Sequence, residues 1–289
     1  MPAQIRKVVI PVAGLGTRVL PATKSIPKEL LPVIDRPLID YVVDEARDAG
    51  IEKIILVTGR GKGAIEDYFD HAFELEATLK AKNKTAILDD VLKTVPIAGN
   101  VSYTRQQAPL GLGHAVWCAR DLVGDEPFAV SLPDEIVVSR PGFLRQMVDA
   151  HERVGGNLVA VEEVPLEDVS KYGVIAPKER NGSLIEMSGM VEKPPAEEAP
   201  SNFRIIGRYV LQADIFNLLE TQERGAGGEI QLTDSMNKLN ENQTFHACIC
   251  DGKIHDCGSK IGWLKANMEL GLAHAEFGPE LRDELKGLL

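Results

Sequence analysis

Glycines and cations stand together near the amino terminus in a pattern that suits phosphate groups. The stretch Gly14-Leu15-Gly16-Thr17-Arg18 follows the apolar run 7–12, and two further cations, Lys24 and Lys28, come soon after it. Backbone N–H groups of glycines can approach phosphate oxygens closely, and prolines at 21, 27 and 32 prevent a regular helix. Three cations on a stiff loop predict a binding site for a triphosphate, with a solvated basic loop as the alternative.

Spacing excludes two familiar nucleotide-binding loops. A dinucleotide-binding fingerprint needs a third glycine at position 19, where this sequence has Val19. A P-loop needs a lysine followed by serine or threonine, whereas Lys62, in a second glycine-rich stretch, is followed by Gly63. The predicted phosphate site therefore belongs to another class of loop.

Carboxylates that can bind a metal ion follow two strand-like runs. Asp134 and Glu135 come directly after the apolar run 128–132, and Asp256 follows the run 245–251. Carboxylate oxygens suit a hard cation such as Mg²⁺. A single aspartate at a strand end is more often a helix cap or a turn former, so residue type alone leaves both interpretations open.

Polar groups suited to a base and to a sugar phosphate occur farther along the chain. Gln106 precedes a glycine-rich run that begins at Gly111, and a glutamine amide offers one acceptor and two donors to a pyrimidine edge. A polar turn before a helix is the alternative. Glu192 and Lys193 are adjacent, and in an extended segment their side chains would face opposite ways and need not pair.

Hydrophobic periodicity predicts the elements that must position these groups. Strands are expected at 7–12, 54–58, 101–105, 128–132 and 158–164, and helices at 37–49, 113–122 and 141–154. This alternation predicts a doubly wound, mainly parallel α/β sheet, in which ligands bind at the carboxyl ends of the strands.

Two insertions and a last helix depart from that alternation. Residues 73–92 are polar and helix-prone and are interpreted as a helical arm, and the glycine- and proline-rich residues 172–211 as a second lobe with short strands. A final helix is expected from Lys260. Its apolar stripe, which should face the core or another subunit, consists of Trp263, Ala266, Leu270 and Ala273.

Composition limits the classes of function. The formal net charge is −11 and the pI is near 5.1, which argues against a nucleic-acid partner but leaves room for a local basic cleft. The four cysteines lack the Cys-x-x-Cys spacing of a zinc site and are expected to pack in the core. Since we find no signal-peptide pattern and no apolar run of about 18 residues, we expect a cytoplasmic protein with no membrane partner.

Several of these stretches together resemble a known enzyme family. Gly14–Arg18 followed by Pro27-Lys28-Glu29-Leu30-Leu31-Pro32 is similar to the signature of the nucleoside-triphosphate sugar nucleotidyltransferases. The run Leu20–Glu29 and the arm stretch Phe73–Ala77 resemble the bacterial UTP–glucose-1-phosphate uridylyltransferases in particular. The resemblance covers nearly the whole chain, and the separate motifs agree in their order.

The resemblance implies one nucleotidyltransferase domain over residues 1–289. Its fold would be Rossmann-like α/β, with a doubly wound, mixed and mainly parallel sheet, an inserted sugar-binding lobe and a helical arm. Residues 1–165 would form mainly the nucleotide-binding half, residues 166–259 the sugar-binding half, and residues 260–289 a C-terminal helical segment.

The resemblance also implies roles for particular residues on the nucleotide side. Arg18 would hold the β- and γ-phosphates, and Lys28 would neutralise charge at the reacting α-phosphate. The base would be read by Gln106, with Gln107 as the weaker candidate. The full set of implied nucleotide-binding residues is Ala13, Gly14, Gly16, Thr17, Gln106 and Gly111.

For the metal and the sugar, the implied residues come from distant parts of the chain. Asp134 and Asp256 would share one Mg²⁺, while the role of Glu135 stays open. Glu192 would bind sugar hydroxyls, and Lys193 would bind the sugar phosphate and act in catalysis together with Arg18 and Lys28. Backbone contacts to the hexose would come from Gly173 and Gly207.

The implied reaction joins UTP and glucose 1-phosphate into UDP-glucose and pyrophosphate by direct in-line attack, with Mg²⁺ as the cofactor. The phosphate oxygen is already ionised, so the reaction requires no covalent nucleophile. A homo-oligomer, either a dimer or a tetramer, is expected, and its product would feed polysaccharide biosynthesis. The alternatives are the same chemistry with dTTP or with galactose or glucosamine 1-phosphate, and a non-catalytic sugar-nucleotide sensor, which would need no in-line geometry.

Overall fold

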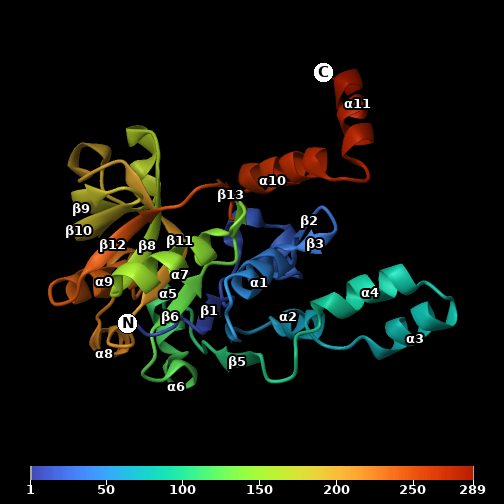
Figure 1. Cartoon of the computed structure of the whole chain (residues 1–289), viewed down its shortest axis with the longest axis horizontal. Helices are drawn as coiled ribbons and strands as arrows, with labels where there is room; N and C mark the ends of the chain where they lie inside the picture. Colours follow the sequence, from blue (N-terminus) through green and yellow to red (C-terminus); the bar gives the residue numbers. More distant parts are fainter. Residues whose placement is uncertain (1, 289) are drawn as a thin grey trace.

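The computed structural model describes residues 2–288 and is built around one nine-stranded mixed sheet (Figure 1). In order across the sheet, the strands are β5 (Val101–Arg105), β4 (Lys53–Thr58), β1 (Lys7–Pro11), β6 (Phe128–Ser131), β11 (Phe203–Leu211), β8 (Asn157–Glu163), β12 (Phe245–Ile249), β10 (Leu184–Glu192) and β9 (Gly173–Asn181).

The strand directions divide the sheet into two regions. β5, β4, β1 and β6 are all parallel, and the chain leaves β1 first toward β4 and later returns to its other side as β6. β11 pairs antiparallel with both β6 and β8, and β10 pairs antiparallel with β9 and β12. The predicted mixed α/β fold is confirmed, although parallel pairs do not predominate within residues 2–288. β5–β4, β4–β1, β1–β6 and β8–β12 are parallel, and as many neighbouring pairs in the sheet are antiparallel. The change of direction beside β1 is where such sheets bind ligands.

Helices cover both faces of the sheet, which is why its central strands are almost wholly apolar. One face carries α1 (Leu38–Asp48), α2 (Gly63–Tyr68) and α7 (Phe143–Val154), and the other carries α5 (Leu112–Trp117), α6 (Arg120–Val123), α8 (Ile215–Thr221) and α9 (Leu232–Asn240). Alternate side chains of β1 enter the two cores: Val9 packs on the α5 side, and Val8 and Ile10 on the α1 side.

Two expectations about secondary structure were wrong. The helix expected at 113–122 is interrupted, because the N–H of Ala119 bonds to the carbonyl of Val116 in a tight turn between α5 and α6. Residues 172–211 do not form the short strands expected. Their three strands have nine residues each and join the main sheet, because β11 is buried along almost its whole length between β6 and β8.

Two helical pairs project from the body of the molecule (Figure 1). The arm consists of α3 (Phe73–Ala81) and α4 (Thr85–Thr94), and the C-terminal segment of α10 (Lys260–Ala273) and α11 (Gly278–Leu288). On the predicted stripe of α10, Ala266 is buried and Trp263 and Leu270 pack against the body, whereas Ala273 is exposed. Trp263 also donates a hydrogen bond from its indole N–H to the carbonyl of Pro32, over 3.0 Å.

Two small two-stranded sheets complete the fold: β2 (Pro32–Val33) pairs with β3 (Arg36–Pro37), and β7 (Glu135–Val138) with β13 (Lys253–Asp256). The second pair matters for the site, because it places Asp256 directly opposite Glu135. All four cysteines are unpaired, and Cys248 and Cys257 are buried. Within residues 2–288, no helix has the length and apolar character needed to cross a membrane.

Candidate active site

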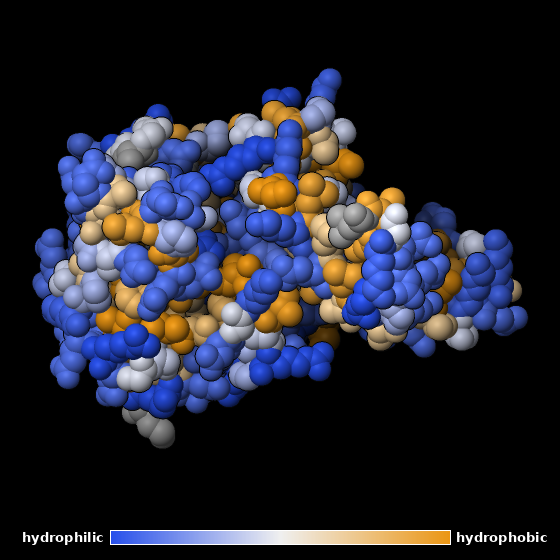
Figure 2. Space-filling view, turned by 90° about the horizontal axis from the view of Figure 1, so that it is seen from above, coloured by the Kyte–Doolittle hydropathy of each residue, from blue (hydrophilic) through white to orange (hydrophobic). Residues whose placement is uncertain are grey.

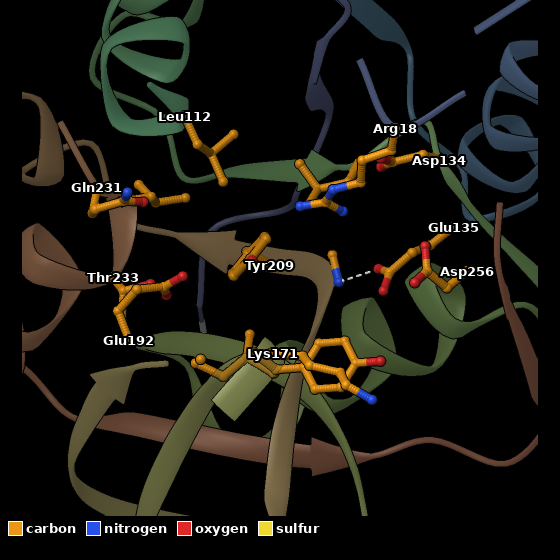
Figure 3. A pocket seen from close by; sticks show the side chains of 16 residues that line it. Arg18, Leu112, Asp134, Glu135, Lys171, Glu192, Tyr209, Gln231, Thr233 and Asp256 are labelled. Carbon is orange, nitrogen blue, oxygen red and sulfur yellow. Dashed lines mark hydrogen bonds between the residues drawn. The ribbon is translucent and has the colours of Figure 1, made fainter. Parts of the chain in front are cut away.

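A pocket lies where β6 and β10 end and β9 begins (Figure 3). It joins residues from both regions of the sheet. Its lining consists of Arg18, Leu112, Leu132, Asp134, Glu135, Lys171, Tyr172, Gly173, Glu192, Ile205, Gly207, Tyr209, Gln231, Leu232, Thr233 and Asp256. Six residues singled out from the sequence as site residues are in this lining: Arg18, Asp134, Gly173, Glu192, Gly207 and Asp256.

The glycine loop after β1 folds tightly against Lys28. Gly16 has a φ of 65°, and its carbonyl accepts a 2.7 Å hydrogen bond from the hydroxyl of Thr23. A Cβ on Gly16 would lie only 3.1 Å from the Cβ of Lys28. Both the left-handed conformation and the close approach favour glycine at this position.

Lys28 forms an ion pair with Asp134 over 2.6 Å, which joins the glycine loop to the end of β6. Burial lowers the pKa of the ammonium, but the carboxylates of Asp134 and Glu29 outweigh this effect, so the pKa of Lys28 is raised. Burial alone would raise the pKa of Asp134, yet Lys28 holds that pKa below its ordinary value. Both groups are therefore charged near neutral pH.

The neighbouring Glu29 anchors this loop to the second glycine-rich stretch. Its carboxylate is buried and lies 2.7 Å from the ammonium of Lys62, which is itself buried. Burial raises the pKa of Glu29 despite the opposing effects of Lys62 and Lys28. Lys62, which does not belong to a P-loop, thus fixes Glu29, the residue beside Lys28, and does not line the pocket.

Asp134 and Asp256, which are far apart in the sequence, face each other across Gly258. A Cβ on Gly258 would lie 2.9 Å from Oδ2 of Asp134 and 3.0 Å from Oδ1 of Asp256. The N–H of Gly258 also donates to Oδ1 of Asp256, over 3.0 Å. The structure thus brings the two predicted metal ligands together around a space that only a glycine leaves open.

Glu135, whose role the sequence left open, holds β11 in place. Its Oε2 accepts a hydrogen bond from the backbone N–H of Gly207, and its Oε1 lies 3.3 Å from the guanidinium of Arg204. Burial raises the pKa of Glu135, although Arg204 and Arg208 oppose the shift. A Cβ on Gly207 would lie 2.5 Å from the same carboxylate, so the contact depends on that glycine.

At the opposite end of the pocket, Glu192 is held by two neighbours. Its Oε2 accepts a 2.8 Å hydrogen bond from the hydroxyl of Thr233, and its Oε1 lies 3.3 Å from the ammonium of Lys193. The extended backbone assumed from the sequence was wrong here, because Lys193 has a φ of 49°. This left-handed residue turns its half-exposed side chain back toward Glu192, while Lys193 itself stays outside the pocket lining.

Gln106, the first residue after β5, is not part of the pocket lining. Its backbone N–H bonds to the carbonyl of Thr58 at the end of β4, over 2.8 Å. Its side-chain nitrogen lies 3.0 Å from both the carbonyl of Gly111 and Nδ1 of His114. Leu112, next to Gly111, does line the pocket (Figure 3).

Sequence reasoning assigned no role to several polar residues of the pocket, among them Lys171 and Thr233. Lys171 lines it and lies 2.5 Å from Asp168, and a lysine at the end of a helical turn carries no signal that separates it from a surface residue. Thr233 lines it as the hydrogen-bond donor to Glu192. Nothing local to Thr233 indicates a partner 41 residues away.

Comparisons with known proteins agree with this geometry. The family model described as Nucleotidyl transferase matches residues 7–271. The UTP–glucose-1-phosphate uridylyltransferase of Bacillus subtilis (strain 168) is 49% identical over 286 residues, which cover 99% of this chain and 98% of that protein. The UTP–glucose-1-phosphate uridylyltransferase YngB of the same strain is 48% identical, with 100% and 96% covered.

Solved structures give the same result. A UTP-bound UGPase from Acinetobacter baumannii has a TM-score of 0.91 at 46% identity, and the match covers 99% of this chain and 100% of that one. A UDP-glucose pyrophosphorylase complexed with UDP-glucose has a TM-score of 0.84 at 42% identity, with 94% and 100% covered. The chain therefore belongs to the nucleotidyl transferase family and, within it, to the UTP–glucose-1-phosphate uridylyltransferases.

Proposed function

We propose that this pocket converts UTP and α-D-glucose 1-phosphate into UDP-glucose and pyrophosphate. The observation that carries the proposal is the distribution of charge. Two cations and two carboxylates, Arg18, Lys28, Asp134 and Asp256, gather at one end, and the sugar-suited Glu192 lies at the other. The printed names of full-length relatives at 48–49% identity, and of neighbours that bind UTP or UDP-glucose, support the same reaction.

The nucleotide would occupy the end beside β1. The backbone from Ala13 to Thr17, including Gly14 and Gly16, would surround the phosphates, with Arg18 on the β- and γ-phosphates and Lys28 at the α-phosphate. This assignment is supported by the position of Arg18 in the pocket lining and by the charged, buried state of Lys28. The base would lie against Gln106 and Gly111.

The hexose would occupy the other end. Glu192 can accept hydrogen bonds from sugar hydroxyls, and Gly173 leaves room beside it for a backbone contact. Gly207, which lines the same pocket next to Glu135, would supply the second backbone contact. Lys193 would bind the sugar phosphate, which requires its ammonium to leave Glu192, and its half-exposed position makes that exchange inexpensive. Lys171, from the same edge, adds a second cation that the sequence did not indicate.

A magnesium ion fits the pair Asp134 and Asp256. The described residues hold no group of three or more His, Cys, Asp or Glu side chains arranged for a metal. Two carboxylates are nevertheless enough for Mg²⁺, which keeps several waters and takes further oxygens from substrate phosphates. The space beside Gly258 lies next to both carboxylates. When bound, Mg²⁺ would offset the negative charge of the phosphates.

The reaction needs positioning more than acid–base chemistry. A phosphate oxygen of glucose 1-phosphate forms a bond to the α-phosphorus of UTP, while the bond from that phosphorus to the bridging oxygen of the β-phosphate breaks and pyrophosphate leaves. Arg18, Lys28 and Lys193 would hold the two polyanions in line and reduce their repulsion. No proton has to be removed from the attacking oxygen.

We also propose that the enzyme is a homo-oligomer, a dimer or a tetramer. Three apolar side chains on α10, Ile261, Leu264 and Met268, are 63%, 49% and 50% exposed and recur at helical spacing. The projecting arm likewise mixes apolar with polar surface (Figure 2) and includes Phe73 at 72% exposure. Sedimentation of the wild type and of Leu264→Glu tests this, because the variant should be smaller if α10 is buried between subunits.

UTP is a cytoplasmic nucleotide, so the proposal places the enzyme in the cytoplasm.

Pyrophosphate release tests the proposed reaction. The protein is incubated with UTP, glucose 1-phosphate and Mg²⁺, then with EDTA, and then with dTTP, galactose 1-phosphate or glucosamine 1-phosphate as replacements. We expect release that needs both UTP and glucose 1-phosphate and stops with EDTA. Faster release with dTTP or another hexose phosphate would change the assigned substrate. Binding of UDP-glucose without release from any pair would indicate a sensor.

A further inference from the structure

One nitrogen holds the side chain of Gln106 at two points. Nε2 of Gln106 lies 3.0 Å from the carbonyl oxygen of Gly111 and 3.0 Å from Nδ1 of His114, and the residue as a whole is 7% exposed. A carbonyl oxygen can only accept, so the atom that faces it must be the amide nitrogen. Its second hydrogen then points to the imidazole. The two partners together fix which end of the amide faces inward.

This arrangement also fixes the state of His114. Its Nδ1 must accept a hydrogen bond, so the ring is neutral and carries its proton on Nε2. Burial lowers the pKa of His114, which favours that neutral form. The ring is stacked on Trp117 at a centroid distance of 5.8 Å, and Arg120 lies over the same indole at 3.7 Å. The acceptor is therefore held in place by the stack.

The second partner, Gly111, cannot move aside. The chain on either side of it is bonded to Ile230: the N–H of Ile230 donates to the carbonyl of Leu110 over 2.7 Å, and the N–H of Gly113 donates to the carbonyl of Ile230 over 2.9 Å. A Cβ on Gly111 would lie 2.8 Å from that same carbonyl. The amide of Gln106 therefore meets two fixed acceptors.

The remaining polar atom of the side chain is Oε1. Within residues 2–288 it accepts no hydrogen bond. It is also not one of the fully buried polar atoms that lack a hydrogen-bond partner. An acceptor that faces the base matches the N3–H of uracil or thymine, whereas cytosine presents a lone pair at N3. The reversed amide would present hydrogens and would match cytosine instead.

We propose that His114 is a specificity-determining positioning residue: as a neutral acceptor it keeps Oε1 of Gln106 turned toward the base, so that the site selects uracil over cytosine. The inference rests on the proposed role of Gln106 in reading the base. It predicts no effect on the choice between UTP and dTTP, because uracil and thymine are alike at N3.

The test compares kcat/KM for UTP, CTP and dTTP in four variants. His114→Phe keeps a flat ring on Trp117 but removes the acceptor, and His114→Leu removes the acceptor in a second way. His114→Asn keeps an acceptor near the place of Nδ1, and Gln106→Ala removes the amide. We expect the UTP/CTP preference to fall about fivefold in His114→Phe and His114→Leu, which corresponds to one hydrogen bond of about 1 kcal/mol. His114→Asn should restore it, and the UTP/dTTP preference should stay constant.

The variants separate the two levels of the argument. If Gln106→Ala lowers the UTP/CTP preference but both acceptor-free variants of His114 keep the wild-type value, the positioning role is wrong and the role of Gln106 stands. An equal fall of the UTP/CTP and UTP/dTTP preferences would also overturn the positioning role, because that pattern indicates general damage to the site. If Gln106→Ala itself changes no preference, Gln106 does not read the base, and the proposed base site is wrong together with the inference.

Discussion

Replacing Gly258 by alanine would insert one methyl group between the two carboxylates proposed to hold the metal. The new Cβ would stand 2.9 Å from Oδ2 of Asp134 and 3.0 Å from Oδ1 of Asp256. The φ of Gly258 lies outside the left-handed region, so the backbone itself accepts alanine. The substitution therefore acts on the site and not on the conformation of the loop.

The size of the effect follows from these distances. Ordinary van der Waals contact begins at 3.4 Å, so each oxygen must retreat by about 0.4–0.5 Å. Metal sites tolerate ligand displacements of only about 0.2 Å, and loss of a supporting interaction typically costs about 10–100-fold in metal affinity or activity. We therefore expect metal binding at least about tenfold weaker in Gly258→Ala.

Binding of Mn²⁺ in the presence of UDP-glucose, followed by electron paramagnetic resonance, measures this affinity without turnover. The dependence of pyrophosphate release on Mg²⁺ concentration measures it again during catalysis. Gly63→Ala is the matched control, because a Cβ on Gly63 meets no atom within 4 Å and should change neither measurement. Thermal unfolding verifies that both variants are folded. Wild-type Mn²⁺ affinity in Gly258→Ala would show that the ion does not sit between Asp134 and Asp256.

Three further sets of substitutions test the two ends of the pocket by steady-state kinetics. Lys193→Ala should raise the KM for glucose 1-phosphate about 10–150-fold, which corresponds to the loss of about 1.5–3 kcal/mol for a charge-assisted contact, and should leave the KM for UTP nearly constant. Equal weakening of both substrates contradicts the assignment. Thr233→Val removes the hydroxyl that donates to Glu192, so the KM for glucose 1-phosphate should rise about fivefold. Thr233→Ser keeps the hydroxyl and should behave as the wild type. A change confined to the KM for UTP contradicts this prediction. Asp134→Asn and Asp256→Asn should each cut kcat strongly, and the double variant little further, because either change disables the same ion; additive losses would mean separate roles.

The parallel half of the sheet could be predicted because its signals are local. β1, β4 and β6 are short apolar runs whose alternate side chains enter two cores. Because helices cover both faces of the sheet, these strands are continuously apolar and can be recognised in the sequence. The place of β11 could not be predicted in the same way. Its pairing with β6 and β8 joins segments that are distant in sequence, and no local pattern records which strands become neighbours.

The same distinction between local and distant signals applies to the site residues. The positions of Arg18 and Asp134 could be expected, since Asp134 comes soon after one predicted strand and Arg18 ends the glycine loop that follows another. The state of Glu135 could not, because its partner Gly207 comes from the strand whose place was unknown. The turn at Lys193 was missed because a left-handed φ at a lysine has no sequence signal comparable to that of glycine.

The interleaving of strands has a consequence for how this molecule can come apart. β8, from residues 1–165, lies between β11 and β12, and β11 in turn separates β6 from β8. Cutting the chain near residue 165 would leave β6 and β8 without their shared neighbour and expose unpaired edges on both fragments. The two halves are thus bound into one cooperative unit that should unfold in a single transition. A different sugar preference would have to arise by substitution within the pocket, because exchanging one half for that of a relative would exchange strands from the middle of the sheet.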